Sequence, residues 1–167
     1  MKNFYVPLIF SFVLGCGAPI AQEATFTSLV VQREVCTLSL QDDEEAVKWY
    51  RLAAEQSDAD AQNALGSMHY NGHGLTQDYE EAAKWYRLAA EQGLALAQVN
   101  LGLLYAYASG VLQDYIRAHM WLDVAAANGY DDARKWRDEL AKHMTPSQIE
   151  SAEALAKECL RSKYKDC

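Results

Sequence analysis

Residues 46–56 read AVKWYRLAAEQ and residues 82–92 read AAKWYRLAAEQ, so ten of eleven positions agree at a distance of 36 residues. The same distance extends some of these matches to a third copy and relates further residues outside the two stretches: Trp49, Trp85 and Trp121; Ala53, Ala89 and Ala125; Ala54, Ala90 and Ala126; Asp42, Asp78 and Asp114; Ala61, Ala97 and Ala133; Leu65-Gly66 and Leu101-Gly102; Gly74 and Gly110; Gly93 and Gly129. A fixed period between about 20 and 50 residues is typical of proteins that stack identical structural units. The sequence therefore predicts a repeat protein with a 36-residue period.

Each repeat is predicted to contain two helices. In the better copy these are residues 58–70 and 79–92, separated by the turn-forming stretch NGHGLTQD at residues 71–78. Asp78 stands where an N-cap is expected, with Glu81 three residues later as a capping-box partner. Gly93 is placed to end the second helix in a left-handed conformation. The same signals recur in the next copy, at Gly110, Asp114 and Gly129.

The spacing of large and small residues predicts how the helices pack. Within residues 79–92, Trp85 lies on or near the same helical face as Ala82, Ala89 and Ala90. Gly66 and Gly102 occupy corresponding positions in the first helix of each pair, where the absent side chain allows a neighbouring helix to come close. We therefore interpret the recurring tryptophans as core residues rather than as ligand-stacking residues.

These positions resemble the pattern A-x3-LG-x2-Y-x2-G-x-GV-x2-D-x3-A-x2-WY-x2-AA-x2-G of the Sel-one-like repeat (SLR), a relative of the tetratricopeptide repeat. The resemblance covers residues 42–133 well, and it implies an all-α, right-handed α-solenoid of stacked helix-turn-helix repeats. It departs from the pattern at His69, which takes a tyrosine position, and at Ala108, which takes a glycine position. In residues 25–41 the register survives only at Leu29, whereas Val30 replaces a glycine and Arg33 a tyrosine. A degenerate capping helix is expected there, although the β-branched content also permits a strand or a poorly ordered segment.

The N-terminus is predicted to be an export signal spanning residues 1–21. A single Lys2 precedes the apolar run FYVPLIFSFVL, which is shorter than the about 20 residues that a membrane-spanning helix needs. Cleavage after Ala21 is one possibility. The stretch VLGC at residues 13–16 also resembles a lipobox, which would make Cys16 a lipidated residue and the lipid the only link to a membrane. A buried strand or helix is the alternative interpretation of this run.

The C-terminal part is predicted to close the stack. Residues 131–144 read as another first helix, followed by a last helix with Thr145 as N-cap, Pro146 as the first residue and Gln148 as the capping-box partner. Five residues of this helix are expected to face inward: Ile149, Ala152, Leu155, Ala156 and Cys159. The predicted organisation is thus a signal segment (1–21), a degenerate segment (22–41), a half repeat (42–57), two full repeats (58–93 and 94–129) and a capping repeat (130–167). Cys36, Cys159 and Cys167 remain for disulfides, but the sequence does not settle their pairing.

Charge and motifs exclude several classes of function. The net charge is −8, and removing residues 1–21 would make it −9, which disfavours nucleic acid as a partner. His69 and His73 have the spacing of a helical zinc pair, but Asn71 and Gly72 are expected to break the helix between them, and zinc needs further ligands. Acidic pairs at helix starts complement the helix dipole. The sequence therefore predicts no catalytic residue, no cofactor site and no metal site.

With catalytic and metal sites excluded, the exposed surface of the helices is the remaining candidate for a functional site. By the 100° step of a helix, a partner-binding strip is predicted on the first helices, which are expected to line the inner wall of the array. It comprises Asn63, Ser67, Tyr70, Val99, Leu103 and Tyr107, with Val99, Leu103 and Tyr70 expected to be exposed, although packing against the next repeat is an open alternative. SLR proteins act as adaptors, so the resemblance implies a non-enzymatic scaffold for protein–protein interaction in the bacterial cell envelope.

Two alternatives stay open. A cysteine-rich branch of the family is associated with binding or slow hydrolysis of β-lactams, but its cysteine pair in each repeat is missing here. Turnover of a chromogenic β-lactam would distinguish this activity from a binding role. A decayed copy without an independent role would be indicated by non-cooperative melting.

Overall fold

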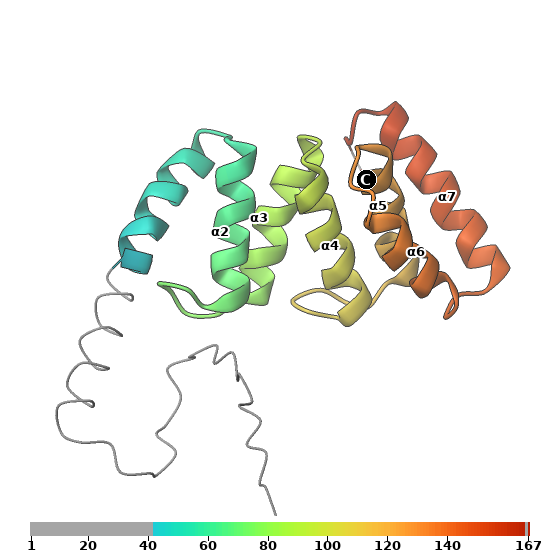
Figure 1. Cartoon of the computed structure of the whole chain (residues 1–167), viewed down its shortest axis with the longest axis horizontal. Coiled ribbons are helices and arrows are strands. Elements are labelled where there is room, and N and C mark those ends of the chain that lie inside the picture. The colour runs from blue at the N-terminus through green and yellow to red at the C-terminus, as the bar shows by residue number, and fades with distance from the viewer. Residues whose placement is uncertain (1–41, 166) are drawn as a thin grey trace, which may run out of the picture. The chain divides into compact units, whose positions relative to one another are not determined.

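A computed structural model describes residues 42–165 and residue 167, and its helices pack against one another in a single stack (Figure 1). Residues 42–55 are helical and are followed by six helices: α2 (Ala59–Asn71), α3 (Tyr79–Glu91), α4 (Ala95–Tyr107), α5 (Tyr115–Ala127), α6 (Ala133–Ala141) and α7 (Pro146–Arg161). Every regular element of this part of the chain is a helix, which confirms the predicted all-α stack. The predicted signal segment, Cys16, Cys36 and residues 25–41 lie outside the described residues.

We call α2, α4 and α6 the A helices, and the helix at 42–55, α3 and α5 the B helices. Asp78 and Asp114 cap α3 and α5 as predicted, because their carboxylates accept hydrogen bonds from backbone amides of the first turn. The capping box predicted with Glu81 is wrong. The Asp78 amide already donates to the His69 carbonyl oxygen at 2.8 Å, and the Glu81 carboxylate pairs with Lys84 instead.

The helix-interior glycines hold each A helix against its own B helix. A Cβ atom at Gly66 would lie 2.7 Å from the Tyr86 ring, and one at Gly102 would lie 3.2 Å from the Ala118 carbonyl oxygen and from Leu122. Both distances are below ordinary van der Waals contact, so any larger residue would push the pair apart. The prediction that these two glycines permit close approach is confirmed.

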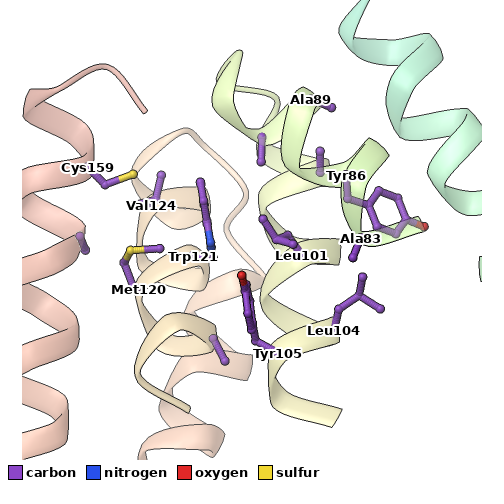
Figure 2. Packing of buried hydrophobic residues seen from close by; sticks show 14 of the residues in the cluster. Ala83, Tyr86, Ala89, Leu101, Leu104, Tyr105, Met120, Trp121, Val124 and Cys159 are labelled. Carbon is purple, nitrogen blue, oxygen red and sulfur yellow. The ribbon is translucent and has the colours of Figure 1, made fainter. Parts of the chain in front are cut away.

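The three tryptophans of the 36-residue register lie in different environments. Trp121 is 2% exposed and belongs to a core cluster with Tyr105, Leu101 and residues of α3, which Figure 2 shows close together. Trp85 is partly buried, and Trp49 is 65% exposed. Trp121 and Trp85 each lie in a cluster that includes residues of the preceding B helix. No described helix precedes residues 42–55, so the core role predicted for Trp49 is wrong for this part of the chain.

A ladder of side-chain amides connects successive repeats. Gln62 donates to the Ala54 carbonyl oxygen at 3.1 Å, and Gln98, 36 residues later, donates to the Ala90 carbonyl oxygen at 3.0 Å. Their own carbonyl oxygens accept from Gln92 at 2.7 Å and from Asn128 at 2.9 Å. Because buried amides need partners, this ladder satisfies Gln62 and Gln98 at positions that are 4% and 0% exposed.

The C-terminal helices partly follow the prediction. Thr145, Pro146 and Gln148 form the predicted capping box at the start of α7. In contrast, α6 is shorter than the predicted 131–144, because residues on both sides of it form turns. Ala152, Ala156 and Cys159 are buried as predicted, but Leu155 is 46% exposed. Since α7 packs mainly against α5, only a narrow face is covered, and Leu155 lies at its edge.

Cys159 and Cys167 form a disulfide, which settles the pairing of these two residues. None of the described helices combines the length and the apolar character that crossing a membrane would require.

A buried histidine makes stability depend on pH. His119 is 3% exposed, and its Nδ1 atom has no hydrogen-bond partner among the described residues. Burial lowers the pKa of His119 below 6.5, although Asp123, Glu153 and Asp138 oppose that shift and Arg137 adds to it. The unfolded chain therefore takes up a proton here at a higher pH than the folded chain does. This contribution to stability is complete above about pH 6.5 and is lost as the pH falls through the lowered pKa of the folded state.

We expect His119→Leu to lose less stability between pH 7 and pH 5 than the unaltered protein, measured as the urea midpoint at each pH. His73→Leu, at an exposed position, is the matched control. Parallel pH profiles for the unaltered protein and His119→Leu would contradict the assignment.

Candidate functional site

The exposed face of the A helices carries two hollows. The smaller one, of about 270 Å³, lies between α2 and α4, and the larger one, of about 570 Å³, lies between α4, α5 and α6. Leu103 and Tyr107 line both, so the two hollows meet at the C-terminal half of α4. We call the combined surface the A-helix groove.

The predicted strip and the A-helix groove overlap in four residues. Ser67, Tyr70, Leu103 and Tyr107 line the smaller hollow. Tyr107 is 75% exposed and Tyr70 is 38% exposed, whereas Leu103 is partly buried. Asn63 is not among the lining residues, but it accepts a hydrogen bond at 3.0 Å from Asn100, which does line the hollow. The structure therefore brings five of the six predicted residues to one side of α2 and α4.

The exposure predicted for Val99 is wrong. Val99 is 1% exposed and packs in a cluster with Leu122, Ala125 and Ala126 of α5 and with Ala133 of α6. The 100° helical step placed Val99 on the side of α4 that points away from α5, yet most of its cluster partners belong to α5. Ala133 of the following A helix completes the cluster, so packing against the next repeat accounts for only part of this burial.

The larger hollow contains residues that the sequence reasoning missed. Trp136, Glu139 and His143 of the α6 region and Tyr115 of α5 line it, together with Leu103, Ala106, Tyr107, Gln113, Leu122 and Leu140. Two of them could have been found. A further step of 36 residues leads from Ser67 and Leu103 to Glu139, and from Asn71 and Tyr107 to His143. Trp136 had no such signal, because its counterparts are Asn100 and Ala64.

The two hollows differ in their chemistry. The smaller hollow is lined by amide, hydroxyl and apolar side chains without a carboxylate, an amine or a guanidinium group. Burial raises the pKa of Tyr86 to about 12, so this tyrosine is a neutral wall of the hollow at physiological pH. The larger hollow is mostly apolar, with Trp136 39% exposed and stacked obliquely on Tyr130 at 5.9 Å between ring centroids. Such a surface suits apolar side chains and uncharged peptide groups.

Metal binding finds no support in the described residues, where no three histidine, cysteine, aspartate or glutamate side chains gather as ligands. His69 lies in the last turn of α2, which ends at Asn71, and His73 follows the left-handed Gly72, so the helix ends between the two histidines as predicted. The Nδ1 atom of His69 is buried, and burial lowers the pKa of this histidine.

Comparison with known proteins agrees with this architecture. The family model described as Sel1 repeat matches residues 39–58, 59–94 and 95–130. A search of curated proteins gives no match.

Two solved structures are similar to the chain. One is a protective antigen present in uropathogenic Escherichia coli strains that displays an SLR fold, with 36% identity and a TM-score of 0.70 over 72% of this chain and 27% of that one. The other is a Sel1 repeat protein from Oxalobacter formigenes, with 27% identity and a TM-score of 0.57 over 72% of this chain and 57% of that one. This chain thus spans less than two thirds of the length of either protein. With its repeats matched over more than half of its residues, the chain belongs to the Sel1 repeat family.

Proposed function

We propose that the protein is a non-enzymatic scaffold of the bacterial cell envelope that binds a protein or peptide partner in the A-helix groove. Sel1 repeats generally mediate protein–protein interaction. The observation that carries the proposal is Tyr107, which is 75% exposed and lines both hollows, although the fold needs no aromatic side chain there. Tyrosine is enriched among the residues that dominate binding energy, because it offers a large rigid surface with a polar end.

The groove favours a particular kind of segment. Its smaller hollow offers uncharged amide and hydroxyl groups, which match the main chain of an extended peptide, while its larger hollow accepts a bulky apolar side chain. Ser67, Asn71 and Asn100 supply polar groups in the first, and Trp136 and Leu140 supply apolar surface in the second. An extended segment with one aromatic or large aliphatic residue would use both.

The envelope location rests on the sequence. The apolar run at residues 4–14 has the length of the hydrophobic region of a signal peptide, and a disulfide between Cys159 and Cys167 is compatible with an oxidising compartment. Intact-mass measurement of protein recovered from the envelope fraction would identify cleavage after Ala21 or lipidation at Cys16. Full-length protein that stays in the cytoplasm would contradict the location while leaving the binding proposal standing.

Tyr107→Ala should weaken partner binding by about 2 kcal/mol, or roughly 30-fold in Kd, as expected for a central tyrosine. Leu112→Ala is the matched control, because Leu112 is 90% exposed in the same repeat but lies outside both hollows. Partners would first be identified by a photo-crosslinking residue placed at position 107, with position 112 as the background.

Affinity would then be measured by calorimetry with the partner so identified. Both alanine variants should melt at the temperature of the unaltered protein, since both side chains are exposed. Equal crosslinking at positions 107 and 112, or an unchanged affinity of Tyr107→Ala for the partner, would contradict the proposal that the A-helix groove is the binding surface.

A further inference from the structure

Residues 162–165, together with Cys167, fold back onto the repeats, and we call them the Tyr164 hook. The Tyr164 hydroxyl donates to Asn128 Oδ1 at 2.8 Å, which places it at the end of the amide ladder that runs through Gln98 to the Ala90 carbonyl oxygen. The Tyr164 ring lies against Gly93, where a Cβ atom would come within 2.7 Å of it. The hook therefore reaches α3 and α5 from the end of α7.

The conformation of the hook depends on local restraints. Lys163 and Tyr164 both have positive φ, at 55° and 66°, a region that costs a non-glycine residue about 1–2 kcal/mol. The Tyr164 amide donates to the Cys159 carbonyl oxygen at 2.8 Å, and the Ser162 hydroxyl lies 2.8 Å from the Lys165 carbonyl oxygen. The Cys159–Cys167 disulfide closes this loop covalently onto α7.

The hook lies beside the most deeply buried of the three repeat tryptophans. Lys165 and Cys167 line a hollow of about 410 Å³ together with Trp121, Tyr105, Arg87, Arg117 and Glu91. Tyr164 and Cys167 also pack against the core cluster that contains Trp121.

The repeat provides an internal comparison. At the preceding step of 36 residues, Trp85 is partly buried, with Arg51 and Glu55 at the positions of Arg87 and Glu91. Around Trp121, Tyr105 replaces His69 and Arg117 replaces Glu81, and α7 with the hook is added. The lower exposure of Trp121, at 2%, is the expected result if the hook covers it.

We propose that the Cys159–Cys167 disulfide is a redox-controlled latch, whose reduction by a dithiol releases the Tyr164 hook and uncovers the surface around Trp121. Cys159 is 2% exposed and Cys167 is only partly buried, so the dithiol attacks the sulfur of Cys167. The S–S bond breaks, its electron pair leaves on the Cys159 sulfur, and that sulfur takes up a proton. The second thiol of the reductant resolves the mixed disulfide, so the reductant is oxidised to its own disulfide and Cys167 is released as a thiol.

Release uncovers a surface unlike the A-helix groove. Arg87 donates to the Tyr105 hydroxyl at 2.7 Å, and the Arg117 guanidinium lies 5.7 Å from the centre of the Tyr105 ring. The uncovered surface therefore combines an indole with two guanidinium groups, and it opens only under reducing conditions.

The test uses the full chain with Trp49→Phe and Trp136→Phe, two changes at exposed positions that leave Trp85 and Trp121 as the main reporters in the described residues. Dithiothreitol is the reductant, and alkylation of Cys159 and Cys167 followed by peptide mapping verifies the reaction. We expect a red shift of tryptophan emission and stronger quenching by acrylamide on reduction, with the far-UV circular dichroism unchanged. The same protein carrying Trp121→Phe as well should show neither change.

A second variant keeps the test independent of the disulfide. Tyr164→Ala, with the disulfide intact, removes the contact with Gly93 and the bond to Asn128, and it should raise the quenching of Trp121 without a reductant. Unchanged quenching after verified reduction would overturn the latch, because the hook would then stay in place without it. Loss of the helical signal on reduction would overturn it equally, because the disulfide would then support the whole fold.

Discussion

Gly110→Ala is expected to destabilise the protein by about 3 kcal/mol or more, although it adds only one methyl group. Gly110 has a φ of 69°, and a Cβ atom there would lie 2.2 Å from the carbonyl carbon and oxygen of Tyr79. That contact joins the loop of one repeat to the first residue of the B helix in the repeat before it. Relief requires a backbone shift at the junction, because neither partner atom belongs to a flexible side chain.

Gly129→Ala separates the steric effect from the conformational one. Gly129 also has positive φ, at 92°, but nothing lies within 4 Å of a Cβ atom there. Two residues of this chain show that a side chain is tolerated at a position with positive φ. Ser57, at the corresponding position of the first copy, has a φ of 66°, and Ala108 adopts 56° at the position that Gly72 holds one repeat earlier. We therefore expect Gly129→Ala to cost only about 1 kcal/mol.

Urea denaturation followed by circular dichroism would give both free energies of unfolding. Gly74→Ala should resemble Gly110→Ala, because a Cβ atom at Gly74 would lie 2.4 Å from the Asp43 carbonyl, one repeat earlier. If Gly110→Ala and Gly129→Ala lowered the free energy of unfolding by similar amounts, the left-handed conformation, rather than the contact with the preceding repeat, would be the reason that position 110 requires glycine.

The second large effect is a graded response to the same substitution at three equivalent positions. Trp121→Ala should cost about 3–5 kcal/mol, because it leaves a cavity in the core. Trp49→Ala should change stability by less than about 0.5 kcal/mol, since that indole is 65% exposed. Trp85→Ala should fall between the two, in line with its partial burial. Losses of equal size at all three positions would contradict the burial that the structure assigns to them.

Thermal melts provide the second readout for this series. For a chain of this size, each kcal/mol corresponds to a shift in Tm of about 2–4 °C, so Trp121→Ala should melt roughly 6–20 °C below the unaltered protein. Trp49→Ala should have the same Tm as the unaltered protein.

The sequence predicted features that depend on one helix and its ends. Asp78, Asp114 and Thr145 cap their helices because a cap involves only neighbouring backbone amides. Gly66 and Gly102 were interpreted correctly because the period shows that both members of each helix pair recur together. Local reasoning failed where a second partner competes, as at Glu81, whose carboxylate binds Lys84 while the His69 carbonyl takes the Asp78 amide.

Predictions failed more often where the answer depends on what lies over a helix. For Val99, Leu155 and Trp49, helical periodicity predicts on which side of its own helix each side chain lies. Their exposure, however, depends on whether a neighbouring helix covers that side. Residues of α5 and Ala133 of α6 cover Val99, and no described helix precedes residues 42–55 to cover Trp49. The helix α7 packs mainly against α5, and this contact leaves Leu155 exposed. The groove follows the same rule: its α4 residues were found from the period, whereas Trp136 comes from a position with no aromatic counterpart.

The amide ladder makes the length of this protein adjustable. Gln62 and Gln98 make the same bond to the helix before them, and Gln92 and Asn128 make the same bond back to them. A duplicated segment of residues 59–94, inserted in tandem, would therefore meet a compatible neighbour at both of its borders without any further substitution. Gene duplication could lengthen or shorten such a chain by whole units, and with it the span of ligand that one molecule can hold.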